Sequence, residues 1–146
     1  MIEIAGIVAV LACTLFCGAA VYINLVEHPG RLSCGTEIAA RQWAPSYKRA
    51  TMMQAPLAVI ATIAGIARWL LTGGSLWLVG SICIFLVVPF TFLVILPTNH
   101  RLLEPGRDLA SPETRDLLTT WGRLHGVRSA LSLLASVLLV CALAGP

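Results

Sequence analysis

The sequence predicts an all-α fold in which a bundle of four transmembrane helices forms the whole domain. Hydrophobic residues make up 58% of the 146 residues and charged residues 12%, whereas soluble globular domains contain roughly 45–50% apolar and about 25% charged residues. The mean hydropathy of +0.86 agrees with this contrast. The chain also has four nearly uncharged stretches, and its charges gather in two of the three connections between them. We therefore expect lipid, rather than water, to surround most of the chain.

The four apolar stretches cover residues 4–26, 51–71, 76–96 and 129–144. A helix needs about 20 residues to cross roughly 30 Å of hydrocarbon, so the first and third stretches are long enough as they stand. The second ends near Arg68, whose long side chain can reach the interface, and the fourth is long enough as 126–144. The first stretch is too long for a signal peptide and has no basic segment before it. We expect residues 1–146 to form a single integral membrane domain.

Glycine and proline residues predict where the helices end. Residues 72–75 read Thr-Gly-Gly-Ser, a tight turn that makes the second and third spans antiparallel neighbours. Pro29 and Pro97 are expected to end the first and third helices, and Pro45 is expected to begin the second. Ser111, followed by proline and glutamate, is a predicted N-cap. From this cap we expect one unbroken helix into the fourth span.

The basic residues predict the orientation of the bundle. Nine of the ten lysine and arginine residues lie in or beside the connections that follow the first and third spans, and only Arg68 lies at the opposite face. Positively charged loops tend to stay in the cytoplasm. We therefore expect a multi-pass protein with cytoplasmic charged loops and with both termini outside. The sequence has no basic run with interleaved aromatic residues, so we expect no nucleic-acid partner.

Polar residues from all four spans are expected at one level, near the charged loops. They recur at spacings of three, four and seven residues, which place them on one face of each helix. Pairing and helix association explain single polar residues in a membrane, but two histidines, a carboxylate and an arginine at one depth predict a functional site. The set consists of Asn24, Glu27, His28, Tyr47, Thr51, Gln54, Thr91, Thr98, Asn99, Trp121, His125 and Arg128.

Three kinds of chemistry fit these residue types. In the first, His28 or His125 is a general base, and Arg128 and Asn99 stabilise an oxyanion or enolate. In the second, His28, His125 and Glu27 bind iron or copper, because two histidines and a carboxylate form a known ligand set. In the third, the two histidines bind a haem between helices. Because no paired spacing on one helix favours a metal, the base is preferred, and metal and haem stay as alternatives.

Several of these residues lie in short motifs. The motifs are Val26-Glu27-His28-Pro29, Tyr47-Lys48-Arg49-Ala50, residues 89–91, Pro97-Thr98-Asn99 and Trp121-Gly122-Arg123-Leu124-His125-Gly126-Val127-Arg128. With them the chain resembles a large group of small integral membrane proteins that includes the fungal anthrone oxygenases. The likeness covers nearly the whole chain. The W-x-x-L-H-x-x-R and P-T-N motifs are its most specific parts.

The resemblance implies an oxidation by molecular oxygen that turns an anthrone into an anthraquinone. It also implies that no cofactor is obligatory, because an anthrone carbanion is electron-rich enough to react with oxygen directly. The implied catalytic residues are His125 and Arg128 of W-x-x-L-H-x-x-R, Asn99 of P-T-N, and His28 of the first motif. The resemblance supports the fold more strongly than the reaction.

The sequence therefore predicts a membrane-embedded oxidoreductase that oxidises a lipophilic phenolic or quinol-like substrate with oxygen. His125 is the expected base and His28 its partner or substitute, with Arg128 and Asn99 at the oxyanion. The expected substrate-binding residues, of which Glu27 also orients a histidine, are Glu27, Tyr47, Gln54 and Trp121.

The expected partners are the lipid bilayer and a hydrophobic small molecule, and homo-oligomerisation is left open. The alternative functions are binding or transport of a small hydrophobic molecule without chemistry, and haem or metal binding. A duplicated half with paired broken helices would favour transport, and the sequence alone reveals no such duplication.

Overall fold

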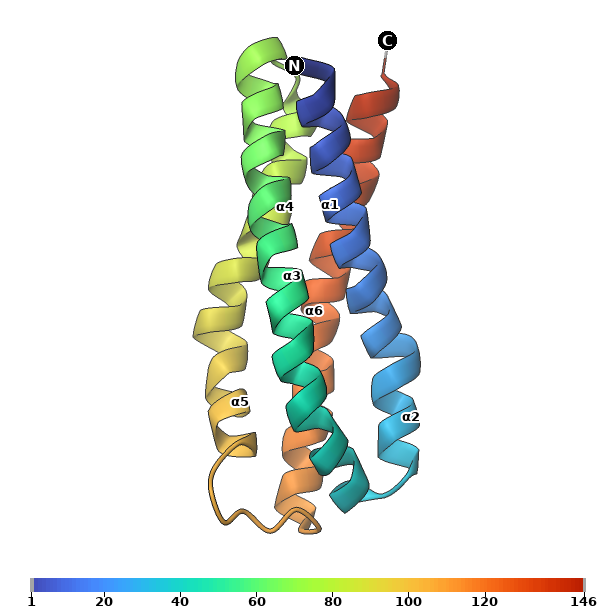
Figure 1. The fold of residues 1–146 in the computed structure, drawn as a ribbon, viewed down its shortest axis with the longest axis vertical. Coiled ribbons are helices and arrows are strands. Elements are labelled where there is room, and N and C mark those ends of the chain that lie inside the picture. Colours follow the sequence, from blue (N-terminus) through green and yellow to red (C-terminus); the bar gives the residue numbers. More distant parts are fainter. Residues whose placement is uncertain (1, 146) are drawn as a thin grey trace.

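The computed structural model describes residues 2–145. Within them, four rods are long and apolar enough to cross a membrane, and no strand is present. The rods lie side by side, with both termini at one end and the long connection before α6 at the other (Figure 1). They cover Ile2–Ser33, Thr36–Thr72, Ser75–Leu102 and Pro112–Ala144. The predictions of an all-α four-helix bundle and of a multi-pass membrane protein are confirmed.

Two of the rods consist of three segments each. The first comprises α1 (Ile2–Tyr22), the π-helical turn η1 (Ile23–Glu27) and α2 (His28–Ser33). The third comprises α4 (Ser75–Phe90), the π-helical turn η2 (Thr91–Ile95) and α5 (Leu96–Leu102). The second and fourth rods are the single helices α3 (Thr36–Thr72) and α6 (Pro112–Ala144).

Pro29 and Pro97 do not end their helices, so the sequence prediction is wrong at both places. Proline has no N–H, and its ring crowds the carbonyl four residues earlier. Each of these prolines follows a π-helical turn by two residues, and the wider turn lets the helix continue. The backbone hydrogen bonds that close the two turns run from the N–H of His28 to Ile23 and from the N–H of Leu96 to Thr91.

Pro45 does not begin α3 but lies well inside it, which also corrects the prediction. Membrane helices tolerate such prolines because neighbouring groups satisfy the freed backbone. The predicted turn after α3 is confirmed, with Gly73 and Gly74 at φ values of 71° and 89° that glycine adopts without strain. Ser111 caps α6 as predicted, since its Oγ accepts a hydrogen bond of 3.2 Å from the N–H of Thr114.

The helices form a square bundle. α1 and α4 each pack against both α3 and α6, while α2 packs on α3 and α5 packs on α6. α3 and α6 also approach each other directly across the bundle. Large apolar side chains such as Leu25, Leu70 and Leu93 lie on the outside, where a membrane would contact them. The polar residues of α3 and α6 are thereby brought face to face.

Two clusters of buried apolar side chains fill the described part of the bundle. Phe16 belongs to the cluster nearer the termini, and Trp43 and Trp121 belong to the cluster nearer the charged loops. The Arg128 guanidinium lies over the Phe16 ring at 5.4 Å, and the His125 ring packs on Trp121 at 4.8 Å. The polar site therefore lies where the two clusters meet.

Candidate active site

His125 lies in the middle of the bundle and is held by an amide. It is 1% exposed, and its Nδ1 lies 2.6 Å from Asn24 Oδ1. The amide is fixed in turn, because Asn24 Nδ2 donates to the Gly122 carbonyl at 2.9 Å and Oδ1 accepts from the Ser129 hydroxyl at 2.7 Å. An amide oxygen only accepts, so Nδ1 of the imidazole carries a proton. In a neutral His125 the lone pair is then on Nε2, where a general base needs it.

Asn24 is the site residue that the predicted catalytic set omits. It lies in η1 and joins this turn to α6 through His125 and Ser129. Its helical spacing to Glu27 and His28 does place it in the polar set. Sequence alone does not distinguish an asparagine that joins helices from one that orients an imidazole. The structure gives Asn24 both roles.

His28 packs against the same tryptophan as His125 but faces the backbone of α6. Its Nε2 lies 2.9 Å from the Leu118 carbonyl, and its ring lies 5.1 Å from that of Trp121. Gly122 makes this close approach possible, because a Cβ there would lie 2.7 Å from the His28 ring. His28 does not line the three cavities described below. It therefore holds α2 against α6, through the Leu118 carbonyl and the Trp121 ring.

Arg128 and Gln54 form a pair between α6 and α3. Arg128 Nη2 donates to Gln54 Oε1 at 2.9 Å, and Gln54 is almost fully buried. Arg128 Nε and Gln54 Nε2 are buried donors without a partner in the described structure. A buried donor without an acceptor is costly. These two side chains are therefore suited to a ligand that brings an oxygen atom between the helices.

Three cavities meet at Gln54. The α1–α3 groove has a volume of about 550 Å³, and the α3–α4 cavity has a volume of about 120 Å³. A narrow throat lies between them and shares lining residues with each. The walls of the throat include one triplet of residues from α3 and one from α6, namely Tyr47, Thr51 and Gln54, and Trp121, His125 and Arg128. The helical registers expected from sequence thus place both triplets in one site.

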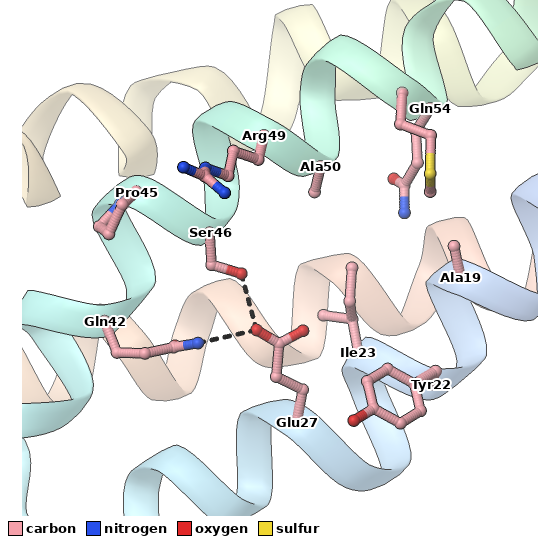
Figure 2. Close-up of a pocket in the computed structure, with 11 residues that line it drawn as sticks. Ala19, Tyr22, Ile23, Glu27, Gln42, Pro45, Ser46, Arg49, Ala50 and Gln54 are labelled. Atoms are coloured by element: carbon pink, nitrogen blue, oxygen red, sulfur yellow. Dashed lines mark hydrogen bonds between the residues drawn. The ribbon is translucent and has the colours of Figure 1, made fainter.

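Glu27 lies in the wall of the α1–α3 groove (Figure 2). Its Oε1 accepts hydrogen bonds from Ser46 Oγ at 2.6 Å and from Gln42 Nε2 at 3.0 Å, and it forms an ion pair with Arg31. The prediction that Glu27 orients a histidine is therefore wrong, because its hydrogen bonds join η1 to α2 and α3. Its position in the groove wall keeps it beside any molecule bound there.

Glu27, His28 and His125 are not brought together. Within residues 2–145, no group of three or more histidine, cysteine, aspartate or glutamate side chains is arranged to hold a metal ion. The nitrogen atoms His28 Nε2 and His125 Nδ1 are instead engaged by Leu118 and Asn24. The ligand set that the sequence offered for iron or copper is therefore not assembled.

Asn99 lies apart from the throat. It is fully buried on α5, one turn from Ile95 and from Leu102 of the cluster nearer the charged loops. It does not line the groove, the throat or the α3–α4 cavity. Both amide atoms of Asn99 are buried without a hydrogen-bond partner in the described structure. The oxyanion role of Asn99 stays a prediction, and the amide that lies next to Arg128 is that of Gln54.

Comparison with known proteins agrees with the motifs. A family described as anthrone oxygenase matches residues 43–138. The chain belongs to the anthrone oxygenase family. The matched region includes both triplets of the throat, whereas Asn24, Glu27 and His28 precede it. Family membership points to an oxygenase-like function.

Two curated relatives show how far the similarity extends. Anthrone oxygenase tpcL of Aspergillus fumigatus is 40% identical over 72 residues, which cover 46% of this chain and 45% of that protein. An anthrone oxygenase of Claviceps purpurea is 26% identical over 146 residues, which cover 90% of this chain and 84% of that protein. The match thus spans less than half of the Aspergillus protein. No solved structure matches the chain significantly.

Proposed function

We propose that the protein is a membrane-embedded oxidoreductase that oxidises an anthrone-like, lipophilic phenolic substrate with molecular oxygen. The observation that carries this proposal is His125 in the throat, with its Nδ1 held by Asn24. Family membership supports the reaction class. The α1–α3 groove supports an organic substrate, because its volume of about 550 Å³ lies in the roughly 300–1,000 Å³ range of small-molecule pockets.

His125 begins the reaction as a general base. Its Nε2 removes a proton from the activated CH₂ carbon of the substrate, and the resulting carbanion is delocalised as a phenolate-type oxyanion. Arg128 and Gln54 separate from each other and donate to that oxygen, because both carry buried donors beside the throat. Tyr47 and Trp121 line the throat, where the reacting edge of the substrate reaches His125.

Oxygen completes the reaction without an external reductant. The carbanion transfers its electrons to O₂, and a carbon–oxygen bond forms to give a hydroperoxide after protonation. Loss of the second proton from the same carbon then breaks the O–O bond and releases water. The balance is one CH₂ group and one O₂ giving one carbonyl and one water. We therefore expect no obligatory cofactor.

Oxygen uptake by the purified protein in lipid nanodiscs tests this function. With an anthrone or a hydroquinone as substrate, we expect uptake that continues after exhaustive chelation and metal analysis. Activity that vanishes with the metal and returns with iron or copper would replace the base mechanism with a metal mechanism. If no phenol is oxidised, the enzyme proposal fails.

A second candidate is a protein that binds or transports a small hydrophobic molecule without chemistry. The matching π-helical turns and prolines in the first and third rods favour it, because paired interruptions of membrane helices mark binding sites in transporters. Saturable binding of an anthrone in the α1–α3 groove, without any oxygen uptake, would support this candidate over the enzyme.

We also propose that both termini lie outside and that the charged connections lie in the cytoplasm. The clustering of basic residues at one end of the bundle supports this orientation. Single cysteines introduced at Ser75 and at Arg107, in a background without the native cysteines, are expected to react from outside and from the cytoplasm, respectively. Labelling of Ser75→Cys only from the cytoplasmic side would contradict the orientation.

A further inference from the structure

We infer that the α3–α4 cavity is the dioxygen site of the reaction, and that the organic substrate approaches the throat from the opposite side, through the α1–α3 groove. This inference rests on the proposed function. The two spaces differ greatly in size, at about 120 and 550 Å³. An apolar cavity of about 150 Å³ stays dry and binds molecules such as xenon, whereas a three-ring phenol needs the larger space. The sizes therefore assign one reactant to each side.

The walls of the α3–α4 cavity suit an uncharged, apolar molecule. They include Phe16, Ala58, Val87, Val88 and Phe92. Four of the five polar residues that line the cavity also line the throat, namely Tyr47, Thr51, Gln54 and Arg128. The hydroxyl of Thr91, which also lines the cavity, donates to the carbonyl of its own helix at 2.7 Å. It therefore offers no free donor to a polar ligand. Binding of an apolar molecule to these apolar walls is favourable, and binding of a charged molecule is unfavourable.

The cavity opens at the outer surface of the bundle, where we expect lipid. Phe92 is 63% exposed, and Thr51 and Ala55 on the facing helix are exposed as well. Dioxygen is apolar and dissolves more readily in hydrocarbon than in water, so a cavity that opens into the bilayer receives it directly. The π-helical turn η2 contributes Thr91 and Phe92 to this opening.

One residue that lines the cavity, Arg128, carries a positive charge that stabilises the anion formed when dioxygen accepts an electron. Arg128 lines both the cavity and the throat. Its guanidinium lies over the ring of Phe16, which also lines the cavity. When the carbanion in the throat transfers charge to dioxygen, the guanidinium is beside the developing anion. The carbon–oxygen bond then forms between a substrate on the groove side and an oxygen molecule on the cavity side.

A matched pair of alanines separates the two routes. Ala55 lines the cavity and Ala19 lines the groove. Ala55→Phe is expected to raise KM for oxygen severalfold and to leave KM for the anthrone nearly unchanged, and Ala19→Phe is expected to do the reverse. Ala130 is exposed on α6 and lines none of the three spaces, so Ala130→Phe controls for insertion of a bulky residue. Equal effects of Ala55→Phe and Ala19→Phe on both constants would overturn the inference.

A second measurement needs no turnover. Dissolved dioxygen is paramagnetic and accelerates the relaxation of nearby methyl groups. Val87 and Ile84 are both on α4 and are 2% and 0% exposed, but of these two only Val87 lines the cavity. Under oxygen pressure we expect much stronger relaxation of the Val87 methyls than of the Ile84 methyls, and we expect Ala55→Phe to remove the difference.

The two measurements distinguish failure of this inference from failure of the proposed function. Equal relaxation at Val87 and Ile84 would overturn the dioxygen site even if the protein oxidises an anthrone. Strong relaxation at Val87 in a protein that consumes no oxygen would keep the site as a cavity for apolar gas and would remove only the enzyme proposal.

Discussion

The two halves of the bundle, residues 2–72 and 75–144, have the same backbone construction. Each begins with a rod that contains one π-helical turn, and in each a proline, Pro29 or Pro97, follows that turn by two residues. Each ends with a long helix that runs back, and α2 packs on α3 as α5 packs on α6. In both halves the π-helical turn accommodates the proline that follows it, and it also contributes to the cavities. Ile23 of η1 lines the groove and the throat, and Thr91 and Phe92 of η2 line the α3–α4 cavity.

The side chains of the two halves differ in charge. Both long helices carry a triplet at i, i+4 and i+7 that faces the throat. In the first half the triplet is neutral, and in the second half it contains an imidazole and a guanidinium. The triplets are Tyr47, Thr51 and Gln54, and Trp121, His125 and Arg128. The catalytic groups therefore lie in the second half. The corresponding residues of the first half serve as matched control positions for mutation.

The largest effect is expected at the second member of each triplet. His125→Ala should lower the rate of anthrone oxidation by on the order of 10²–10⁴, because it removes the general base. Thr51→Ala should lower it far less. The initial rate of oxygen uptake gives both values, and gel filtration in detergent checks that both proteins fold. Equal losses would show that the two halves do not differ as proposed.

The next effect is expected at the third member. Arg128→Lys keeps the charge but loses the planar fork of donors, so we expect a loss of roughly tenfold, below the 10²–10³ that removal of an oxyanion donor costs. Gln54→Leu should lose less, because Arg128 then still donates. Steady-state kinetics should place the loss from Arg128→Lys in kcat. A loss confined to KM would mean that Arg128 only binds the substrate.

An effect of similar size is expected from Asn24, which acts on His125 without touching the substrate. Asn24→Leu removes the acceptor for His125 Nδ1–H. Loss of the partner that orients a metal-bound histidine costs on the order of 10–100-fold in activity, and we use the same scale for this catalytic histidine. We expect the lower end here, together with a change in the tautomer of His125. Nitrogen NMR of labelled histidine reads the tautomer directly. Lost activity with an unchanged tautomer would make Asn24 a structural residue only.

The smallest effect on chemistry is expected at the position that follows the first member of each triplet. A Cβ at Gly122 would lie 2.7 Å from the His28 ring, so Gly122→Ala should destabilise the fold by about 1–3 kcal/mol through overpacking. Its counterpart Lys48 is exposed, and Lys48→Ala should change stability little. Denaturation in mixed micelles measures both. A normal stability for Gly122→Ala would show that His28 does not need this close approach.

Hydropathy alone predicted the four rods, because membrane spans are defined by length and apolar composition. It did not predict that Pro29 and Pro97 leave their rods continuous, since a π-helical turn depends on hydrogen bonds that sequence does not display. The same turns explain the errors in the site. A straight helical register puts Asn24, Glu27 and His28 on one face, but η1 inserts an extra residue into its turn. Asn24 consequently bonds to His125, while Glu27 bonds to Ser46.

On α3 and α6 the helical spacing predicted correctly which residues share a face, because no π-helical turn interrupts either helix within residues 36–72 or 112–144. Tyr47 and Gln54, and Trp121 and Arg128, reach the throat as their spacing predicted. Asn99 follows η2, and there the register expected from sequence again fails. The apolar wall residues of the α3–α4 cavity, such as Ala58, Val87 and Val88, carry no polar signal, so their sequence pattern offers no reason to group them with the polar residues that also line it.

Proton removal by His125 can be measured without oxygen. Under anaerobic conditions in D₂O, we expect the protein in nanodiscs to exchange the acidic CH₂ protons of an anthrone faster than empty nanodiscs do, and we expect His125→Ala to abolish the difference. Proton NMR of the recovered substrate gives the exchange rate. Exchange by His125→Ala as fast as by the unaltered protein would contradict the assignment of His125 as the base.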